Sequence, residues 1–133
     1  MLESINHIGI AVKNLEDSME LFGKIFGVED FHTEIVEKQK VKVASFKVGD
    51  VLLELTSPTS EDSPIAKFIE KKGEGIHHIA FQTSEIDADL AMLKGKGINL
   101  INEAPVAGAH DMQIAFLHPK STNGVLMEIC QPK

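Results

Sequence analysis

The sequence has no arginine, tryptophan or tyrosine, and its only cysteine is Cys130. A lone cysteine excludes an internal disulfide bond and is typical of a reducing compartment. Without arginine, the chain has no planar, bidentate clamp for a carboxylate or a phosphate. Without tryptophan and tyrosine, only phenylalanine is available to stack against bases or sugars. An anionic substrate would therefore be met by lysines, backbone amides or a metal ion.

Long hydrophobic runs and excess positive charge are also absent. No apolar stretch approaches the ~20 residues of a membrane-spanning helix, and no basic segment followed by an apolar one begins the chain. The formal net charge is −7, which argues against a nucleic-acid partner because phosphates need clustered cations. With 43% hydrophobic residues in 133, we expect one compact cytoplasmic domain over residues 1–133, with neither a membrane nor a nucleic-acid partner.

Secondary-structure signals occur twice in the same order. Residues 5–12 alternate as a strand, a helix runs from the cap Asn14 to Gly27, and three strands follow. After a connector helix with Pro64 in its first turn, residues 76–82 form a strand, Ser84 caps a second helix that ends at Gly97, and three strands follow. The further strands are expected at residues 28–36, 41–48, 51–56, 99–101, 113–117 and 124–129.

The chain thus reads as two βαβββ modules, at about 3–57 and 75–133, joined by a connector at about 58–74. This pattern predicts an α+β fold in which the two modules form an open, curled mixed β-sheet around a metal site. Equivalent positions in the two modules are about 70 to 74 residues apart.

Four polar residues lie inside apolar strands at matched positions of the two modules. His7 precedes Glu54 by 47 residues, and His78 precedes Glu128 by 50. An ionised glutamate within an apolar strand is costly unless it is paired or coordinated. Two imidazoles and two carboxylates suit one divalent ion such as Co, Zn, Ni or Mn, with positions left for water or substrate.

A strand histidine is more often structural than a metal ligand, and the neighbouring His77 competes with His78 for the role. We assign His78 because it matches His7 in the repeat and shares its strand face with Ala80. The small neighbour leaves room for an ion and a ligand, whereas His77 would point to the opposite face.

Three stretches carry a resemblance that spans nearly the whole chain: NHIGIAV, DSPIAKFIEKKGEGIHHIAF and FLHPKSTNGVLMEICQ. They resemble the vicinal oxygen chelate (glyoxalase/bleomycin resistance/dioxygenase) superfamily, and within it they are most similar to the methylmalonyl-CoA epimerase family. The resemblance implies a homodimer that acts on an acyl-CoA substrate. It also implies a 1,1-proton transfer between (2R)- and (2S)-methylmalonyl-CoA through a metal-stabilised enolate.

The resemblance also implies roles for individual residues. Glu128 matches the family glutamate that is both a metal ligand and a catalytic acid/base. The chemistry of the side chains, and not the resemblance, leads us to expect that the loop with Lys120, Ser121 and Thr122 offers hydrogen-bond donors to the anionic end of the substrate.

The second catalytic glutamate of the family has no direct match in this chain. Strict matching places Lys38 at that position, with Glu37 one residue away. A protonated lysine cannot take up a proton, so we assign the second base to Glu37. A one-residue shift on a strand turns a side chain to the opposite face, so Glu37 requires a local bulge or an altered hairpin.

Two other functions fit the same pattern. A glyoxalase-I-like isomerase uses the same donor types on this fold, although its glutathione-dependent forms usually hold their substrate with arginine. A non-catalytic, metal-dependent ligand-binding protein would suit the lysine at the position of the base. A dioxygenase fits less well, because a fourth protein ligand would occupy the position that oxygen needs.

Overall fold

The computed structural model describes residues 1–133 and contains three α-helices, eight strands and three short 3-10 turns. In chain order these are β1 (Ser4–Ala11), α1 (Leu15–Phe26), β2 (His32–Val36), η1 (Glu37–Gln39), β3 (Val41–Val48), β4 (Val51–Pro58), α2 (Pro64–Lys72), β5 (Gly75–Gln82), α3 (Ile86–Gly95), β6 (Val106–Ala107), η2 (Ala109–Asp111), β7 (Met112–Phe116), η3 (Pro119–Ser121) and β8 (Met127–Pro132). None of the three helices has the length and hydrophobicity needed to cross a bilayer.

Hydrogen bonds connect the strands in the order β2-β3-β4-β1-β5-β8-β7-β6, and the sheet is mixed because β5 and β8 run parallel. The predicted α+β class with a mixed sheet is confirmed. The chain divides into two compact units, Ile8–His77 and the combination of Met1–His7 with His78–Lys133. The strands β1 and β5 therefore contribute to both units.

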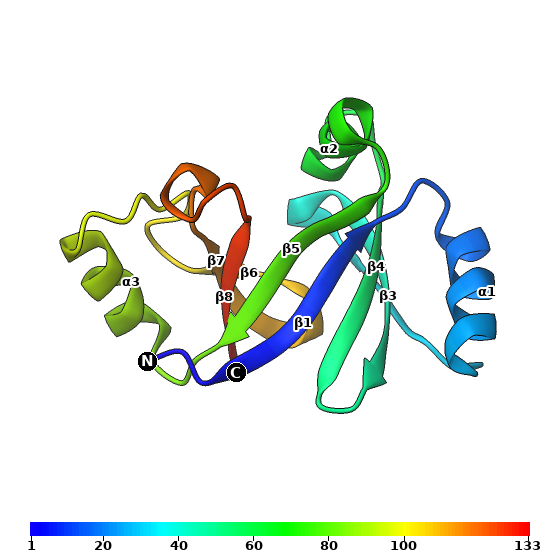
Figure 1. The fold of residues 1–133 in the computed structure, drawn as a ribbon, viewed down its shortest axis with the longest axis horizontal. Helices are drawn as coiled ribbons and strands as arrows, with labels where there is room; N and C mark the ends of the chain where they lie inside the picture. Colours follow the sequence, from blue (N-terminus) through cyan, green and yellow to red (C-terminus); the bar gives the residue numbers. More distant parts are fainter. The chain divides into compact units, whose positions relative to one another are not determined.

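The unit Ile8–His77 is built on the antiparallel strands β2, β3 and β4 (Figure 1). The helix α1 covers one face of this sheet, where Leu15 packs on Ala44 and Leu55. The helix α2 packs on the other face, where Ile65 contacts the core formed by Ala11, Val41 and Val43.

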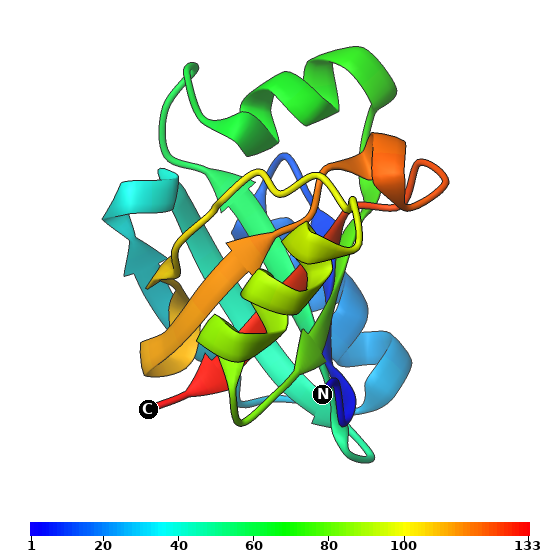
Figure 2. The same ribbon diagram turned by 90° about the vertical axis from the view of Figure 1, so that its left-hand side faces the viewer.

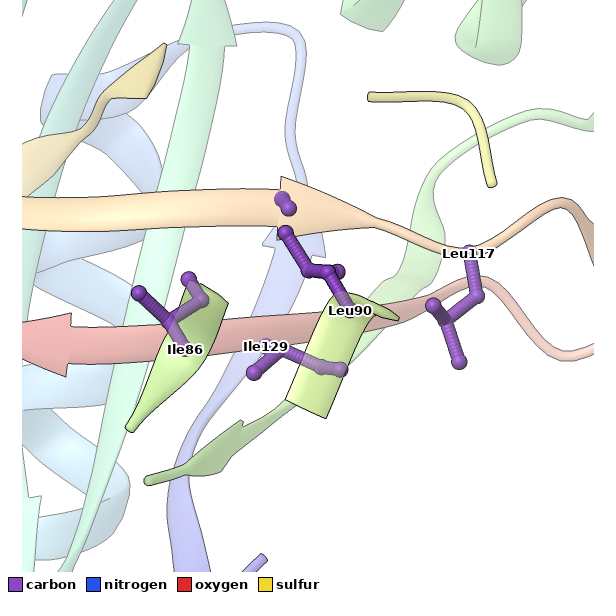
Figure 3. Close-up of a cluster of buried hydrophobic side chains, with 5 residues drawn as sticks. Ile86, Leu90, Leu117 and Ile129 are labelled. Carbon is purple, nitrogen blue, oxygen red and sulfur yellow. The ribbon is translucent and has the colours of Figure 1, made fainter. Parts of the chain in front are cut away.

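In the unit formed by Met1–His7 and His78–Lys133, α3 lies along β7 and β8 (Figures 1 and 2). Ile86 and Leu90 of this helix pack on Ile129 of β8 and on Leu117, and Ala115 completes the cluster (Figure 3). Side chains alternate along a strand, so Glu128 and Cys130, the neighbours of Ile129, belong to the face that α3 leaves uncovered.

The internal repeat is visible in the backbone hydrogen bonds of the two units. The Val12 amide donates to the Thr56 carbonyl at 2.9 Å, and the Thr83 amide donates to the Cys130 carbonyl at 2.9 Å. Each bond joins the end of a first strand to a last strand, two residues beyond Glu54 or Glu128. The two glutamates thus occupy equivalent places in their own units, as the sequence repeat predicts.

Helix starts follow the sequence signals in two of three cases. The Asn14 side chain accepts a hydrogen bond from the Asp17 amide and caps α1, and Ser63 caps α2 just before Pro64. The prediction that Ser84 caps α3 is wrong. At the start of this helix, the Glu85 amide instead donates to the Thr83 hydroxyl. The Ile86 amide donates to the side-chain oxygen of Gln131 on β8.

The strand expected at residues 99–101 is reduced to a single bridge between Leu100 and Leu117. The side chain of Asn102 accepts the Phe116 amide hydrogen bond that a backbone carbonyl would otherwise take. The pairing therefore stops there, and the outer strand of this unit is β6, with Val106 opposite Ile114.

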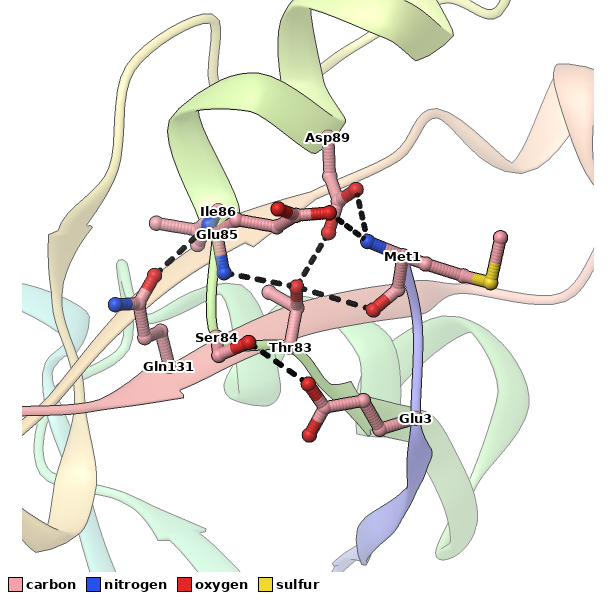
Figure 4. A network of polar contacts seen from close by, with 8 residues as sticks. All are labelled: Met1, Glu3, Thr83, Ser84, Glu85, Ile86, Asp89 and Gln131. Atoms are coloured by element: carbon pink, nitrogen blue, oxygen red, sulfur yellow. Dashed lines mark hydrogen bonds and ion pairs between the residues drawn. The ribbon is translucent and has the colours of Figure 1, made fainter.

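A polar network ties the start of the chain to α3 (Figure 4). The N-terminal ammonium of Met1 lies 2.7 Å from Oδ1 of Asp89, and the Thr83 hydroxyl donates to the same carboxylate. Hydrogen bonds to Asp89 and Glu85 raise the pKa of this ammonium. Asp89 is buried, so these two donors supply the partners that a buried carboxylate requires.

Candidate metal centre

Three of the four predicted ligands lie in one unit, on three neighbouring strands. His7 is on β1, His78 on β5 and Glu128 on β8, and these residues are 2%, 7% and 3% exposed. Ala80 is in register with Glu128 across the parallel β5–β8 pair and is completely buried. A small residue therefore lies beside the glutamate, as the sequence predicted for this strand face.

The donor atoms of these residues converge. Nε2 of His7 lies 3.1 Å from Nε2 of His78. The two carboxylate oxygens of Glu128 lie 3.3 Å from Nε2 of His7 and 3.4 Å from Nε2 of His78. The two imidazole rings meet edge to face, with centroids 5.2 Å apart.

This spacing fits ligands of one ion. Two donors about 2.1 Å from a divalent ion, at angles between octahedral and tetrahedral values, lie about 3.0–3.4 Å from each other. In addition, the buried Oε2 of Glu128 makes no hydrogen bond, although it faces an imidazole nitrogen. Two imidazoles and a carboxylate are the donor set that Zn, Co, Ni or Mn accepts, so these residues fit a divalent transition ion.

Two further polar residues extend this cluster. The side-chain oxygen of Asn6 lies 2.7 Å from Nδ1 of His7, and the Asn6 amide nitrogen donates to Oε1 of Gln82 at 2.9 Å. Cys130 is also close, because its sulfur, a His7 nitrogen and a Glu128 oxygen lie within 4.8 Å of one another.

Asn6, Gln82 and Cys130 have no role in the site predicted from the sequence. For Cys130 a signal was present, since it shares a strand face with Glu128. For Asn6 the only local signal is its place directly before the ligand His7. The partnership of Asn6 with Gln82 joins residues 76 positions apart, and no local pattern announces it.

Glu54 lies in the other unit, Ile8–His77. It is buried on β4, in register with the buried Ser45 of β3. Its neighbour Leu55 packs under α1, so Glu54 belongs to the face that α1 leaves uncovered. On the same face, the hydroxyl of Thr56 is buried without a hydrogen bond.

His77 differs from His78 in its environment. Its ring packs edge to face on Phe68 of α2, with centroids 4.9 Å apart, and burial lowers its pKa to about 4. A neutral, apolar-packed imidazole is a structural residue. The structure thus brings His78, and not His77, to His7 and Glu128.

Glu37 and Lys38 lie in the 3-10 turn η1, and both are exposed. The turn ends at Lys40, which adopts a left-handed conformation with φ of 55° and forms an ion pair with Asp62. A hydrogen bond from Lys40 holds the pKa of Asp62 at about 2. The β2–β3 connection therefore contains a helical turn at Glu37, in which the Glu37 side chain is exposed.

The proposed substrate loop folds around η3. The Ser121 hydroxyl accepts hydrogen bonds from the backbone and side-chain nitrogens of Asn99, both at 3.0 Å. The Thr122 hydroxyl donates to the Val125 carbonyl. Both hydroxyls thus hold the loop in place, whereas Lys120 is exposed.

Comparison with known proteins adds independent information. A family model described as the glyoxalase/bleomycin resistance protein/dioxygenase superfamily matches residues 6–116. An uncharacterized protein of Bacillus subtilis, YqjC, is 44% identical over 99% of this chain and 94% of its own length. Human mitochondrial methylmalonyl-CoA epimerase is 37% identical over 98% of this chain and 74% of its own length.

Solved structures give the same result. Streptomyces coelicolor methylmalonyl-CoA epimerase, with one glutamate replaced by glutamine and 2-nitronate-propionyl-CoA bound, is 41% identical over 99% of both chains. Its fold superposes with a TM-score of 0.95. Further structures of that enzyme carry replacements of the same glutamate by leucine and of a glutamine by alanine.

Proposed function

Because the chain belongs to the methylmalonyl-CoA epimerase family of the glyoxalase/bleomycin resistance protein/dioxygenase superfamily, we propose that it interconverts (2R)- and (2S)-methylmalonyl-CoA. The family recognised in the sequence is thereby confirmed, and its named members are isomerases. The observation that carries the proposal is the convergence of His7, His78 and Glu128 in a chain that matches these epimerases over nearly its full length.

In this proposal, His7, His78 and Glu128 hold one divalent ion. Glu54 is the fourth ligand, which its burial and its place in the sequence repeat support. When bound, the ion would supply Lewis acidity that polarises the thioester carbonyl of the substrate and acidifies the neighbouring carbon. Cobalt, zinc, nickel and manganese all suit this donor set.

Glu128 has a second role in this proposal. One of its oxygens can remain a ligand while the other gives or takes a proton at the acidified carbon, because a carboxylate has two acceptor oxygens. Its burial limits the contact of this carboxylate with bulk water while it holds the proton.

Glu37 is the proposed base for the opposite face of the carbon. A carboxylate can take up a proton, whereas a protonated lysine cannot, and this favours Glu37 over Lys38. The turn η1 is the local feature that distinguishes its backbone from a plain strand.

The proposed contact with the anionic end of the substrate depends mainly on Lys120. It is exposed on the η3 loop. The hydroxyls of Ser121 and Thr122 are engaged within the loop, so their contribution would be to fix its shape. The proposal also retains the expected homodimer and cytoplasmic location, and sedimentation of the purified protein tests the first of these.

The test is an epimerase assay in deuterated water, on metal-stripped protein and after addition of Co, Zn, Ni or Mn. We expect epimerisation with metal-dependent deuterium uptake at C2. Glu128→Gln and Glu37→Gln should each lower kcat by about 100-fold or more, the range of a lost general acid or base. Lys38→Gln, the matched control, should stay within about threefold of the wild type.

Other outcomes would redirect the proposal. Loss of activity in Lys38→Gln with normal activity in Glu37→Gln would move the second base to the lysine. Substrate binding without any deuterium exchange would indicate a metal-dependent binding protein. Isomerisation of a glutathione hemithioacetal, in the absence of epimerase activity, would indicate a glyoxalase-I-like enzyme.

A further inference from the structure

One ring nitrogen of His7 faces the other candidate metal ligands, and the second ring nitrogen faces a neutral amide side chain. Its Nε2 faces His78 at 3.1 Å, and its Nδ1 lies 2.7 Å from the side-chain oxygen of Asn6. The amide nitrogen of Asn6 donates to Oε1 of Gln82 at 2.9 Å. Gln82, Asn6 and His7 thus form a chain of two hydrogen bonds between β5 and β1.

We propose that Asn6, oriented by Gln82, is a positioning residue that holds His7 as the Nδ1–H tautomer and so keeps the Nε2 lone pair available for metal binding. A neutral imidazole carries one proton, and the hydrogen bond at one nitrogen decides which nitrogen carries it. The proposal rests on the metal site described under the proposed function. It adds two residues to which the sequence repeat gave no role.

The direction of the chain of hydrogen bonds is what makes Gln82 necessary. An asparagine side chain offers an oxygen on one side and an NH2 group on the other. If Asn6 were turned over, its NH2 group would face Nδ1 of His7, and the ring proton would then move to Nε2. That proton would point at Nε2 of His78 and remove the lone pair a metal needs. The acceptor Oε1 of Gln82 prevents this by holding the Asn6 NH2 group.

A backbone hydrogen bond fixes the Gln82 end of this chain of hydrogen bonds. The Glu3 amide donates to the Gln82 carbonyl at 2.8 Å, which ties the segment before β1 to the end of β5. Asn6 is partly buried, so its hydrogen bonds compete less with water than those of an exposed amide. Partners of metal-binding histidines of this kind typically contribute 10- to 100-fold to metal affinity, which is about 1.4–2.7 kcal/mol.

The first experiment reads the tautomer without any metal. Nitrogen-15 NMR of the histidine rings in metal-free protein at about pH 8, where histidine is neutral, should show His7 protonated at Nδ1. In Asn6→Leu the Nε2–H form should become substantially populated. Asn102→Leu is the matched control, because it removes another partly buried asparagine that accepts a hydrogen bond in the same unit. It should leave His7 unchanged.

The second experiment measures Co²⁺ and Zn²⁺ affinity by calorimetry. Asn6→Leu should weaken binding by about 10- to 100-fold, and Gln82→Leu should weaken it by a smaller factor of about 3 to 10. Asn6→Asp and Gln82→Glu retain the acceptor in the required place, so both should bind within about threefold of the wild type. Rescue by these two variants separates orientation of His7 from a loss of general stability.

The outcomes distinguish this inference from the proposed function. If the Asn6→Leu and Gln82→Leu variants have the same His7 tautomer and the same metal affinity as the wild type, the positioning role is wrong. If the tautomer and affinity change as expected but no epimerase activity is found, the positioning role of Asn6 and Gln82 is supported and the proposed reaction fails. If the wild type binds no metal, the proposed centre and the inference that rests on it both fail, whatever the tautomer.

Discussion

Ala80 illustrates how much a single side chain decides at the candidate centre. It is completely buried, in register with Glu128 on β8 and two residues from His78 on the same strand. A larger residue here would add carbon atoms to the face on which the three ligands lie. The ligands themselves are common residue types, and the small neighbour beside them is what leaves room for an ion.

We therefore predict that Ala80→Val weakens Co²⁺ binding by at least about tenfold, because the added methyl groups displace the ligands. Overpacking should also lower the free energy of unfolding by about 1–3 kcal/mol. Calorimetry and urea unfolding measure the two effects. Ala115→Val is the control, since Ala115 is equally buried, but in the cluster under α3. It should lose stability and keep its metal affinity, and equal affinity losses in both variants would contradict the prediction.

At the scale of elements, α1 and α3 each pack on the sheet face opposite a buried glutamate. The helix α1 packs on Leu55, and α3 packs on Ile129. The neighbouring glutamates, Glu54 and Glu128, consequently lie on the faces opposite α1 and α3. The helices thus do more than add apolar burial, because they determine which side of each strand carries the polar residues.

The end of α1 depends on a close backbone approach at Gly23. A Cβ atom there would lie 2.7 Å from the Val28 carbonyl oxygen, whereas one at Gly95 of α3 would meet nothing within 4 Å. Gly23→Ala should therefore destabilise the protein by about 1–3 kcal/mol, since backbone must move. Gly95→Ala should be neutral or stabilise it by up to about 1 kcal/mol, the helix preference for alanine. Urea unfolding of both variants decides, and equal effects would refute the packing argument.

The junction between the start of the chain and α3 is expected to be sensitive to acid. Burial alone would raise the pKa of Asp89, but hydrogen bonds from the Met1 ammonium and the Thr83 hydroxyl outweigh it, and the pKa lies below its ordinary value of 3.8. The unfolded chain therefore binds this proton at a higher pH than the folded one. The contribution to stability is present above about pH 4 and is lost as the pH falls through the folded pKa.

Asp89→Asn should accordingly lower the free energy of unfolding by about 1.5–3 kcal/mol at pH 7, because hydrogen bonds to a buried charge are lost. The difference from the wild type should shrink toward pH 3. Asp87→Asn, an exposed change in the same helix, should alter stability by less than about 0.5 kcal/mol. Urea unfolding between pH 3 and pH 7 measures all three proteins. A wild type and an Asp89 variant that lose stability in parallel would show that this carboxylate is not responsible.

At the scale of the whole molecule, the candidate centre links segments that are far apart in the chain. His7, His78 and Glu128 lie on β1, β5 and β8, and β1 and β5 each run through both compact units. An ion that binds only the folded state stabilises it by mass action. Metal loading and folding should therefore be coupled.

We expect Co²⁺ or Zn²⁺ at about 100 times its Kd to raise the free energy of unfolding by about 2.7 kcal/mol, and EDTA to reverse the gain. His78→Ala should abolish the gain. His77→Ala should retain it, because His77 packs on Phe68 of α2 and not in the cluster. Thermal and urea unfolding with and without metal provide the measurement, and a gain that survives in His78→Ala would place the ion elsewhere.

Much of this fold can be read from the sequence, because its signals are local and repeated. Asn14 caps α1 and Pro64 lies in the first turn of α2, both at their predicted places. The capping of α3 by Gln131 could not be read, since that residue is 45 positions away in the chain. The strand expected at residues 99–101 was wrong for a similar reason: a side chain of the loop replaced a backbone partner.

The sequence by itself predicted two βαβββ modules, each with one histidine and one glutamate inside apolar strands, because strand alternation and burial cost act along short stretches of chain. It also singled out His78 over His77 through the repeat. Only the tertiary structure decided that Nε2 of His7, Nε2 of His78 and the Glu128 carboxylate converge within 3.4 Å, and that Asn6 and Gln82 orient the first of them. Those relations depend on strand pairing between distant segments, and no pattern confined to neighbouring residues contains that information.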